Sequence, residues 1–586
     1  MLRSFVPGLF CAVVSSAAVF SAAVAAQETT AQPAIAPNRF VPADSCLVAR
    51  IAAPAKWRQQ FAKTQVNKLM ASQTLTPLLD QATAHIDAAL GQLRTSGKFD
   101  ADLIEKLLKD YTGDLVISVQ VDWPAMIKAA QEDGPPPITF VAALTPDGSY
   151  DLAALAAAIT KFAEEQTEQR RPLKDLTVGD LRLRITDDDM AAACLPAMVD
   201  GHLVMIGGSG IEKSAERLLS ADKRYEGTIG SQPFFVHAKL DDAMKTLITA
   251  LEDQMESGEL SAMPVPVSDM IAWFGFGGLQ TMSMSLGAED QHVAAEFAVT
   301  LSGDATGLMG AVMLEQQPKL LRLVPPGSEW FSITPFDVGA LYRTLATAWT
   351  DLGDVVPITF DEAMKSFTEA MKVRLDEDLI AHVGTEVLMV EDLTEIDEDV
   401  SEEDGPPALA GTCVAVSLKN GKAFGESLET LLRSRGLHAA RKTEEYAGTK
   451  VHQLKPAGLV ELEYAVAGDL LLLVVGKSEG ARRNLRAVLD AQASTAAAEL
   501  PASVQKHLQA LPAGWSGISV TPVGQLLGGF STMFDTLSAM GETTDEVAQT
   551  FEVLSKLGGE MQRLGIDHMV STSYTTRRSL VSRLRW

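Results

Sequence analysis

The hydrophobic residues of this chain follow helical spacing in some stretches and alternate at period two in others. Apolar positions between Leu75 and Leu93 recur every three or four residues, which predicts an amphipathic helix. The stretch Leu181 to Ile185 alternates strictly, which predicts a half-buried strand. Asp200-Gly201 separates two apolar runs, and because glycine accepts positive φ, it predicts an antiparallel hairpin. Antiparallel strands interleaved with helices predict an α+β fold with helices covering one sheet face.

The same pattern of elements occurs twice along the 586 residues. The pentapeptide Glu132 to Pro136 recurs at Glu403 to Pro407, each time before an apolar strand. Further pairs recur at separations of 267 to 287 residues: Val41-Pro42 with Val324-Pro325, Gly113 with Gly384, Asp147-Gly148 with Asn420-Gly421, Gly201 with Gly468, and Gly278 with Gly565. Single hydrophobic cores stop growing near 250 to 300 residues. We therefore expect two diverged tandem repeats, residues 38–320 and 321–586, each a mostly antiparallel sheet covered by helices.

The N-terminal segment has the composition of an export signal. Arg3 is followed by the apolar run Phe5 to Val24 and by an Ala-x-Ala exit. We expect residues 1–26 to be a signal peptide cleaved near Ala25 or Ala26, with 27–37 as a linker. The mature protein would then be periplasmic or secreted, with no membrane span. A retained anchor is the alternative, because about 20 apolar residues can cross a bilayer.

Net charge and cysteine content narrow the possible partners. The formal charge of −27 makes nucleic acid an unexpected partner, because phosphate binding relies on clustered Lys and Arg, and it disfavours an anionic membrane surface.

After signal cleavage Cys46, Cys194 and Cys413 remain, each in an apolar, strand-like stretch. A disulfide framework would use an even, spaced set. We expect buried thiols, with one unassigned bridge left open.

Ser478 is the sharpest catalytic candidate. Gly476 to Gly480 matches G-x-S-x-G after an apolar run and before a helical stretch, as in the nucleophile elbow of α/β-hydrolases. The elbow belongs to a parallel sheet, whereas the run Leu470 to Val475 follows a hairpin turn. Ser209 stands at the matching place in the first repeat, and a serine where strand meets helix is typical of an N-cap. Asp535 and His568 do not stand out as partners. We favour the capping interpretation and keep the serine hydrolase as the alternative.

The sequence predicts no cofactor and no metal site. Lys213-Ser214 and Gly476-Lys477-Ser478 lack a glycine that a phosphate loop needs. The nine histidines show no zinc spacing. Nine of the fourteen residues from Glu391 to Asp404 are acidic, but they lack the glycine and final glutamate of a calcium loop. A solvated loop is favoured, and an acidic calcium-dependent module is the alternative.

The chain resembles an uncharacterised family of exported bacterial proteins, a domain of unknown function. The resemblance rests on Val41 to Ser45 before a strand, on Gly113-Asp114 before the next strand, and on Asp200-Gly201 with Ser209. Repeat two departs from it, with Pro326-Gly327 in place of Ala43-Asp44. The family implies no catalytic residues. We expect an exported, non-enzymatic protein that binds an unknown protein or envelope component, with the ligand and the oligomeric state left open.

Overall fold

The computed structural model describes residues 40–586 except 97–99, 132–136, 168–172, 179–180, 187–194, 210, 220–228, 231, 257–264, 290, 392–411, 456–460, 477, 495–498, 510, 512–513 and 524–555. The chain forms two compact units. Unit 1 comprises residues 1–246, 281–297 and 531–565, and unit 2 comprises 247–280, 298–530 and 566–586. The units therefore interleave along the sequence.

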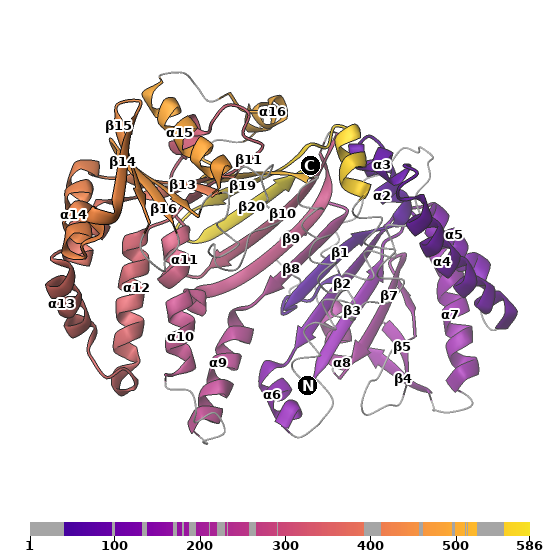
Figure 1. Ribbon diagram of the computed structural model, residues 1–586. Coiled ribbons are helices and arrows are strands. Elements are labelled where there is room, and N and C mark those ends of the chain that lie inside the picture. Colours follow the sequence, from indigo (N-terminus) through magenta and orange to yellow (C-terminus); the bar gives the residue numbers. More distant parts are fainter. Residues whose placement is uncertain are drawn as a thin grey trace, which may run out of the picture. The chain divides into compact units, whose positions relative to one another are not determined.

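The first part of the chain mixes helices and strands, as Figure 1 shows. Its elements are β1 (Leu47–Ala52), α2 (Pro54–Phe61), α3 (Gln65–Met70), α4 (Thr76–Ser96), α5 (Ala101–Asp110), β2 (Asp114–Val121), α6 (Trp123–Gln131), β3 (Ile138–Leu144), α7 (Leu152–Thr167), β4 (Leu173–Val178), β5 (Leu181–Thr186), β6 (Ala197–Val199), β7 (His202–Gly208), α8 (Ile211–Leu219), β8 (Phe234–Lys239), α9 (Asp241–Glu256), α10 (Val267–Phe274), η3 (Phe276–Gly278), β9 (Leu279–Glu289) and β10 (His292–Leu301).

The later part of the chain also mixes helices and strands. Its elements are α11 (Gly307–Val312), η4 (Leu320–Leu323), β11 (Trp330–Pro335), α12 (Val338–Asp351), η5 (Gly353–Val355), α13 (Phe360–Met371), the π-helix η6 (Leu375–Leu379), η7 (Ile380–His382), β12 (Val383–Glu391), β13 (Thr412–Leu418), α14 (Gly421–Ser434), η11 (Leu437–Ala440), β14 (Arg441–Tyr446), β15 (Thr449–Leu454), β16 (Leu462–Ala467), β17 (Leu470–Val475), α15 (Glu479–Ala493), α16 (Ala502–Gln509), β18 (Gly517–Pro522), β19 (His568–Thr575) and β20 (Ser579–Arg585).

In unit 1 the strands pair antiparallel in the order β9-β8-β1-β2-β3-β7-β6. The hairpin of β4 and β5 is a separate two-stranded sheet. Asp200 and Gly201 take φ of 48° and 81° between β6 and β7, which is the positive-φ pair of a tight hairpin turn. The hairpin expected at Asp200-Gly201 is thus confirmed.

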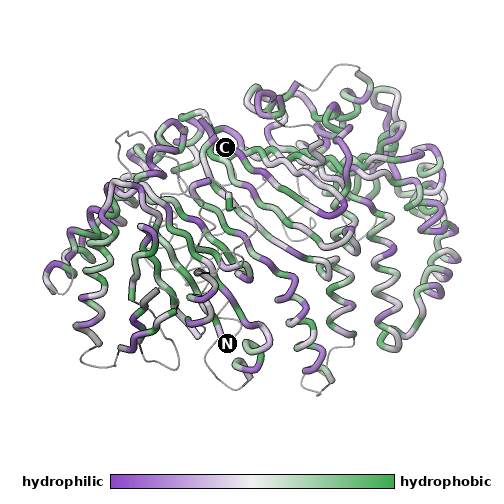
Figure 2. Tube along the Cα trace, turned by 180° about the vertical axis from the view of Figure 1, so that it is seen from behind, coloured by the Kyte–Doolittle hydropathy of each residue, from purple (hydrophilic) through white to green (hydrophobic). Residues whose placement is uncertain are grey.

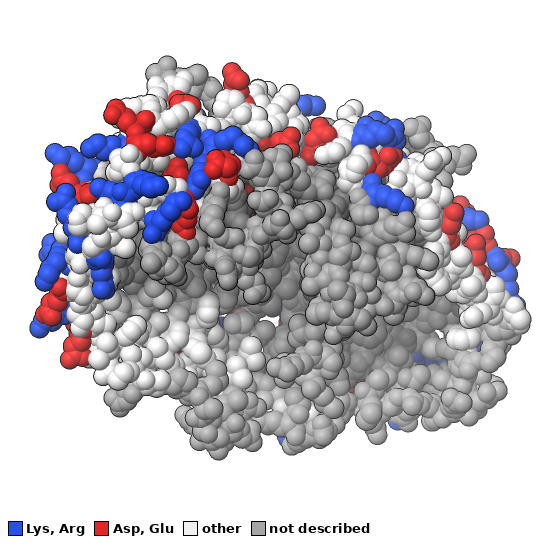
Figure 3. All heavy atoms as spheres, in the orientation of Figure 1, with Lys and Arg blue, Asp and Glu red and all other residues white. Residues whose placement is uncertain are grey.

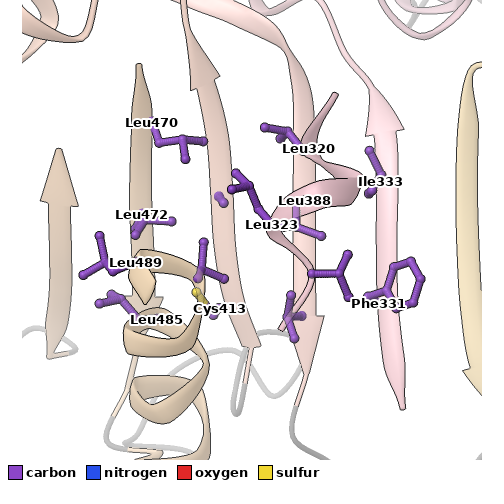
Figure 4. Packing of buried hydrophobic residues seen from close by; sticks show 14 of the residues in the cluster. Leu320, Leu323, Phe331, Ile333, Leu388, Cys413, Leu470, Leu472, Leu485 and Leu489 are labelled. Carbon is purple, nitrogen blue, oxygen red and sulfur yellow. The ribbon is translucent and has the colours of Figure 1, made fainter. Parts of the chain in front are cut away.

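In unit 2 the strands also pair antiparallel, in the order β20-β19-β18-β11-β12-β13-β17-β16-β15-β14. The main core lies between β11, β12, β13 and β17 and the elements η4, α15 and α16. Figure 4 shows Leu388 and Leu472 of the strands on the side where Leu323 and Leu485 pack. Figure 2 shows hydrophobic residues concentrated along the strands.

Helices cover both faces of these sheets, whereas the sequence pattern predicts helices on one face only. In unit 2, α15 packs on the face that carries Leu472, and α14 packs on the opposite face through Leu432 and Tyr464. In unit 1, Leu203 packs with α7, whereas its neighbour Val204 packs with α8 and β5. Adjacent strand residues point to opposite faces, so these apolar runs fit a sheet buried on both sides.

Several expected elements are confirmed: the bounds of β3, α8 and α10 are those the apolar patterns predict. The predicted strand Leu181 to Ile185 is β5, but its partner β4 was not expected. α6 and the hairpin of β14 and β15 were also missed, because their sequences are short or polar. Both copies of the repeated pentapeptide, the N-terminal signal and linker, and Cys194 lie outside the described residues.

Candidate functional site

Ser478 lies between β17 and α15 and caps the helix. Its Oγ accepts a hydrogen bond from the backbone N–H of Ala481 at 3.1 Å. Gly476, just before it, has φ of 94° and donates its N–H to the Glu461 carbonyl at 2.8 Å. The hydroxyl therefore satisfies a backbone donor that a helix start leaves unpaired.

The strand before Ser478 runs antiparallel to both of its neighbours, β13 and β16. A nucleophile elbow lies instead at the end of a strand in a parallel sheet. His568 is on β19, five strands from β17 when the pairings are followed through β13, β12, β11 and β18. With about 4.8 Å between strands, that places His568 roughly 24 Å away. The structure does not bring these two residues together, and Asp535 lies outside the described residues.

An ionic cluster surrounds the start of α15. Arg482 lies one turn after Ser478, and its guanidinium contacts three carboxylates: Glu461, Glu463 and Glu479. The Nε atom is 3.1 Å from Glu463 Oε2, and Nη1 is 2.8 Å from Glu479 Oε1. Glu461 also contacts Lys455 Nζ at 2.9 Å. The arginine thus joins helix α15 to the segment that opens β16.

The cluster continues along α15 toward the sheet edge. Arg486, one turn further, contacts Glu444 of β14 at 2.6 Å. Its guanidinium carbon lies 5.9 Å from the ring centre of Tyr446, a cation–π distance. The Tyr446 hydroxyl donates to Asp490 Oδ2 at 2.8 Å. Figure 3 shows acidic and basic side chains interspersed on this part of the surface.

The carboxyls of Glu461 and Glu463 have opposite pKa shifts. Burial raises the pKa of Glu463 and outweighs the charges of Arg482 and Arg486. For Glu461 burial acts in the same direction, but the hydrogen bond from Lys455 and the charge of Arg482 outweigh it, so its pKa is lowered. Both side chains are buried, with exposed fractions of 7% and 5% for Glu461 and Glu463. Carboxyls shifted apart can serve as acid and base, but here each contacts a cation that also orders the fold.

A second polar group lies on the α14 face of the same strands. His452 Nδ1 is 2.9 Å from Thr443 Oγ1, and its ring centre is 4.9 Å from that of Tyr464. Burial and the charge of Arg441 lower the pKa of His452. Arg441 donates to the Tyr464 hydroxyl at 3.1 Å and pairs with Glu429 of α14. This group joins α14 to the β14–β15 hairpin.

The remaining candidates have structural contacts. Ser209 follows β7, and its N–H donates to the Ile138 carbonyl at 3.1 Å; its predicted role as a cap of α8 stays a prediction. Ser214 is buried and donates to Gln120 Oε1 at 2.6 Å. Cys46 and Cys413 are free thiols. Cys413 is buried as expected, and burial raises its pKa to about 12.

The acidic loop and the helices are candidates for a metal site and for a membrane span. Of the acidic loop, Glu391 alone is described, so the calcium alternative stays a prediction. Among the described residues no group of three acidic, histidine or cysteine side chains is placed to hold a metal ion. Within the same residues no helix combines the length and the apolar character that crossing a bilayer requires.

Sequence reasoning missed the ionic cluster, although a signal was present. Glu461 and Glu463 are two residues apart, which places both on one face of a strand, and Arg482 and Arg486 are four apart on a helix. That spacing predicts facing charges only if the helix is known to pack on the strand. The pairing of α15 with β16 depends on the tertiary fold, which the pattern does not specify.

Comparisons with known proteins give no family. No family model matches the chain, and no curated protein matches it. Among solved structures the chain is similar to crystal forms III and IV of TP0453, with 10% identity in each case. Each match covers 46% of this chain and 81% of the other chain, with a TM-score of 0.20.

Proposed function

We propose that this chain is an exported, non-enzymatic envelope protein that binds an unknown protein or envelope component, related to the exported bacterial family that the sequence resembles. The observation that carries the proposal is the hydrogen bond from Ala481 to Ser478. The hydroxyl of the one catalytic candidate serves the helix start, and the charged groups beside it bind one another. A binding role then explains the exported chain better than catalysis does.

We further propose that the chain arose by tandem duplication. Two observations support this. The strand order β9-β8-β1-β2-β3-β7-β6 matches β19-β18-β11-β12-β13-β17-β16 element by element. The paired glycines occupy matching hairpin turns: Gly201 lies between β6 and β7, and Gly468 lies between β16 and β17. The boundary at residue 320 stays a prediction about where one copied segment ends and the next begins. It does not divide the two compact units, because these interleave along the sequence.

A binding surface is supported by exposed apolar side chains in unit 2. Leu345, Val355 and Ile358 are 55%, 56% and 46% exposed, and all lie within one segment from α12 to the start of α13. Large apolar residues grouped on a surface mark interaction sites more often than scattered ones do. The replacement of Leu345 and Ile358 by lysine tests whether binding to an envelope extract depends on them.

The experiment that separates binding from hydrolysis is labelling of the purified protein with a fluorophosphonate. We expect no covalent adduct on the wild type. Among the described residues, no base lies within hydrogen-bond distance of the Ser478 hydroxyl to activate it. An adduct on the wild type that is lost in Ser478→Ala would overturn the proposal and favour the hydrolase. A melting temperature raised by calcium but not by magnesium would favour the acidic module instead.

Export has its own test. N-terminal sequencing of the protein recovered from the periplasmic or secreted fraction should give a chain that begins near Gln27. A full-length chain found in the membrane fraction would favour the retained anchor.

A further inference from the structure

β14 is an edge strand of the unit 2 sheet. Within the part of the chain that the structure describes, it pairs with β15 and with no second strand. Its four central residues, Lys442 to Glu445, are exposed. An edge strand presents alternate N–H and C=O groups to the outside, which can pair with another strand. Charges on such an edge commonly prevent association, so the order of the charges decides between the two outcomes.

The charges of β14 are ordered so that the strand complements itself. Arg441 and Lys442 precede Thr443, and Glu444 and Glu445 follow it. When two copies of a strand pair antiparallel about a two-fold axis, opposed residues lie on the same face, so the axis passes beside one residue. With Thr443 at the axis, Lys442 faces Glu444 of the second copy, and Arg441 faces Glu445 of the second copy. The two-fold axis repeats each of these two charge pairs with the copies exchanged, so the interface contains each pair twice.

We propose that β14 pairs with β14 of a second copy of this chain, antiparallel and centred on Thr443. The pairing joins two unit 2 sheets into one continuous sheet. Opposite charges directly across an antiparallel pair stabilise it, whereas like charges destabilise it. A shift by two residues in either direction would place Lys442 or Glu444 at the axis, opposite its own copy. The charge order therefore selects the register as well as the partner.

The strand is held in an extended form by contacts on both faces. Arg441 is bound on the α14 face by Glu429 and the Tyr464 hydroxyl. Glu444 and Tyr446 are bound on the α15 face by Arg486 and Asp490. These contacts order the strand before a second copy arrives, which lowers the entropy lost on pairing.

The corresponding hairpin strand of unit 1 lacks this charge order. β4 carries one basic and one acidic residue, Lys174 and Asp175, which are adjacent. Adjacent residues point to opposite faces, so they cannot face each other across a two-fold axis. Lys174 thus provides a control for a charge change on an equivalent strand.

The test measures the mass of the whole protein in solution, by sedimentation equilibrium, with three variants. We expect a dimer that weakens by at least about tenfold in dissociation constant between about 0.05 M and about 0.5 M NaCl, since salt screens exposed charges. Lys442→Glu and Glu444→Lys should each be monomeric under conditions where the wild type is dimeric, because each variant opposes like charges. Lys174→Glu, with the same change in net charge as Lys442→Glu, should stay dimeric.

Mixing the two monomeric variants gives the decisive result. Lys442→Glu carries acidic residues at both positions, and Glu444→Lys carries basic residues at both, so an equimolar mixture should form a heterodimer. Recovery of the dimer also shows that neither variant is misfolded. A wild type that is monomeric at low salt, or a mixture that stays monomeric while the wild type dimerises, would overturn the proposal.

Discussion

Arg482 is the residue on which the charges beside Ser478 depend. Its side chain is 14% exposed, and it contacts two buried glutamates from the segment that opens β16. Removal of this arginine would leave both buried glutamates without the cation they share, and breaking a buried ion pair typically costs about 3–5 kcal/mol. We therefore expect Arg482 to contribute mainly to the stability of the fold.

The opposite pKa shifts of Glu461 and Glu463 predict that replacement by glutamine has opposite effects on stability at the two positions. Glu463 has a raised pKa, so its contribution to stability falls as pH rises above the ordinary value of 4.5. Glu461 has a lowered pKa, so it stabilises the fold above 4.5, and this is lost as pH falls through its folded-state pKa. At neutral pH, Glu463→Gln should raise the free energy of unfolding and Glu461→Gln should lower it.

Urea unfolding at several pH values checks this pair. Both differences from the wild type should shrink as the solution is acidified, because the glutamates are then protonated in both states. The two variants change charge equally on one strand, so each is the control for the other. Equal signs for the two variants at neutral pH would contradict the assignment.

Ser478→Ala should destabilise the protein by about 1 kcal/mol, because it removes the side-chain acceptor at the start of α15. Ser478→Asp keeps an acceptor at the same place and should retain most of the stability. The midpoint of urea unfolding measures both. If the alanine and aspartate variants were equally destabilised, the hydroxyl would have a role other than capping.

At the scale of elements, two glycines of α14 should respond oppositely to alanine. A Cβ on Gly421 would lie 1.7 Å from the carbonyl oxygen of Gly468, in the turn between β16 and β17. A Cβ on Gly425 would meet only Val466 Cγ1, at 3.7 Å. Gly421→Ala should therefore cost about 1–3 kcal/mol through overpacking. Gly425→Ala should stabilise by up to about 1 kcal/mol through helix propensity.

Thermal unfolding of the two alanine variants, followed by circular dichroism, separates these outcomes. Both substitutions add one methyl group to the same helix, so composition is matched. A melting temperature of Gly421→Ala that is equal to or above that of the wild type would mean that the start of α14 does not press on the turn between β16 and β17.

The sequence predicts elements well where local pattern is sufficient. β3 and α10 have strong apolar patterns with clear limits, and the turn at Asp200 has the residues that positive φ requires. β14 was missed because five of its six residues are charged or polar, and only its pairing with β15 makes it a strand. Ser478 was correctly interpreted as a cap, since capping is local. Its ionic neighbours belong to other elements, so local pattern could not reveal them.

At the scale of the whole molecule, unit 2 includes residues from before the predicted boundary at 320. Buried Glu386 of β12 accepts backbone hydrogen bonds from Lys319 and Leu320 at 2.9–3.0 Å. Asp337, just before α12, donates its N–H to the Ala311 carbonyl of α11 at 2.8 Å. The segment 298–320 is thus part of the second sheet's support.

A fragment of residues 321–586 should consequently be much less stable than one of residues 298–586. The shorter fragment leaves the Glu386 carboxylate without its donors, a loss on the order of 3–5 kcal/mol for a buried charge. Circular dichroism and urea unfolding of both fragments measure the difference. Glu386→Gln in the longer fragment is the control for the carboxylate itself. Equal stability of the two fragments would contradict this reasoning.

The attachment of α15 has a mechanical consequence. A helix that rests on leucines alone can slide along a sheet, because one apolar contact replaces another at a step of about 5.4 Å per turn. Arg482 and Arg486 instead reach carboxylates on the segment that opens β16 and on β14 at fixed heights along the helix. A slide by one turn would separate Arg482 from the buried Glu461 and Glu463, and it would separate Arg486 from Glu444 at the surface. We therefore expect helix α15 and these strands to move together when the protein binds a partner.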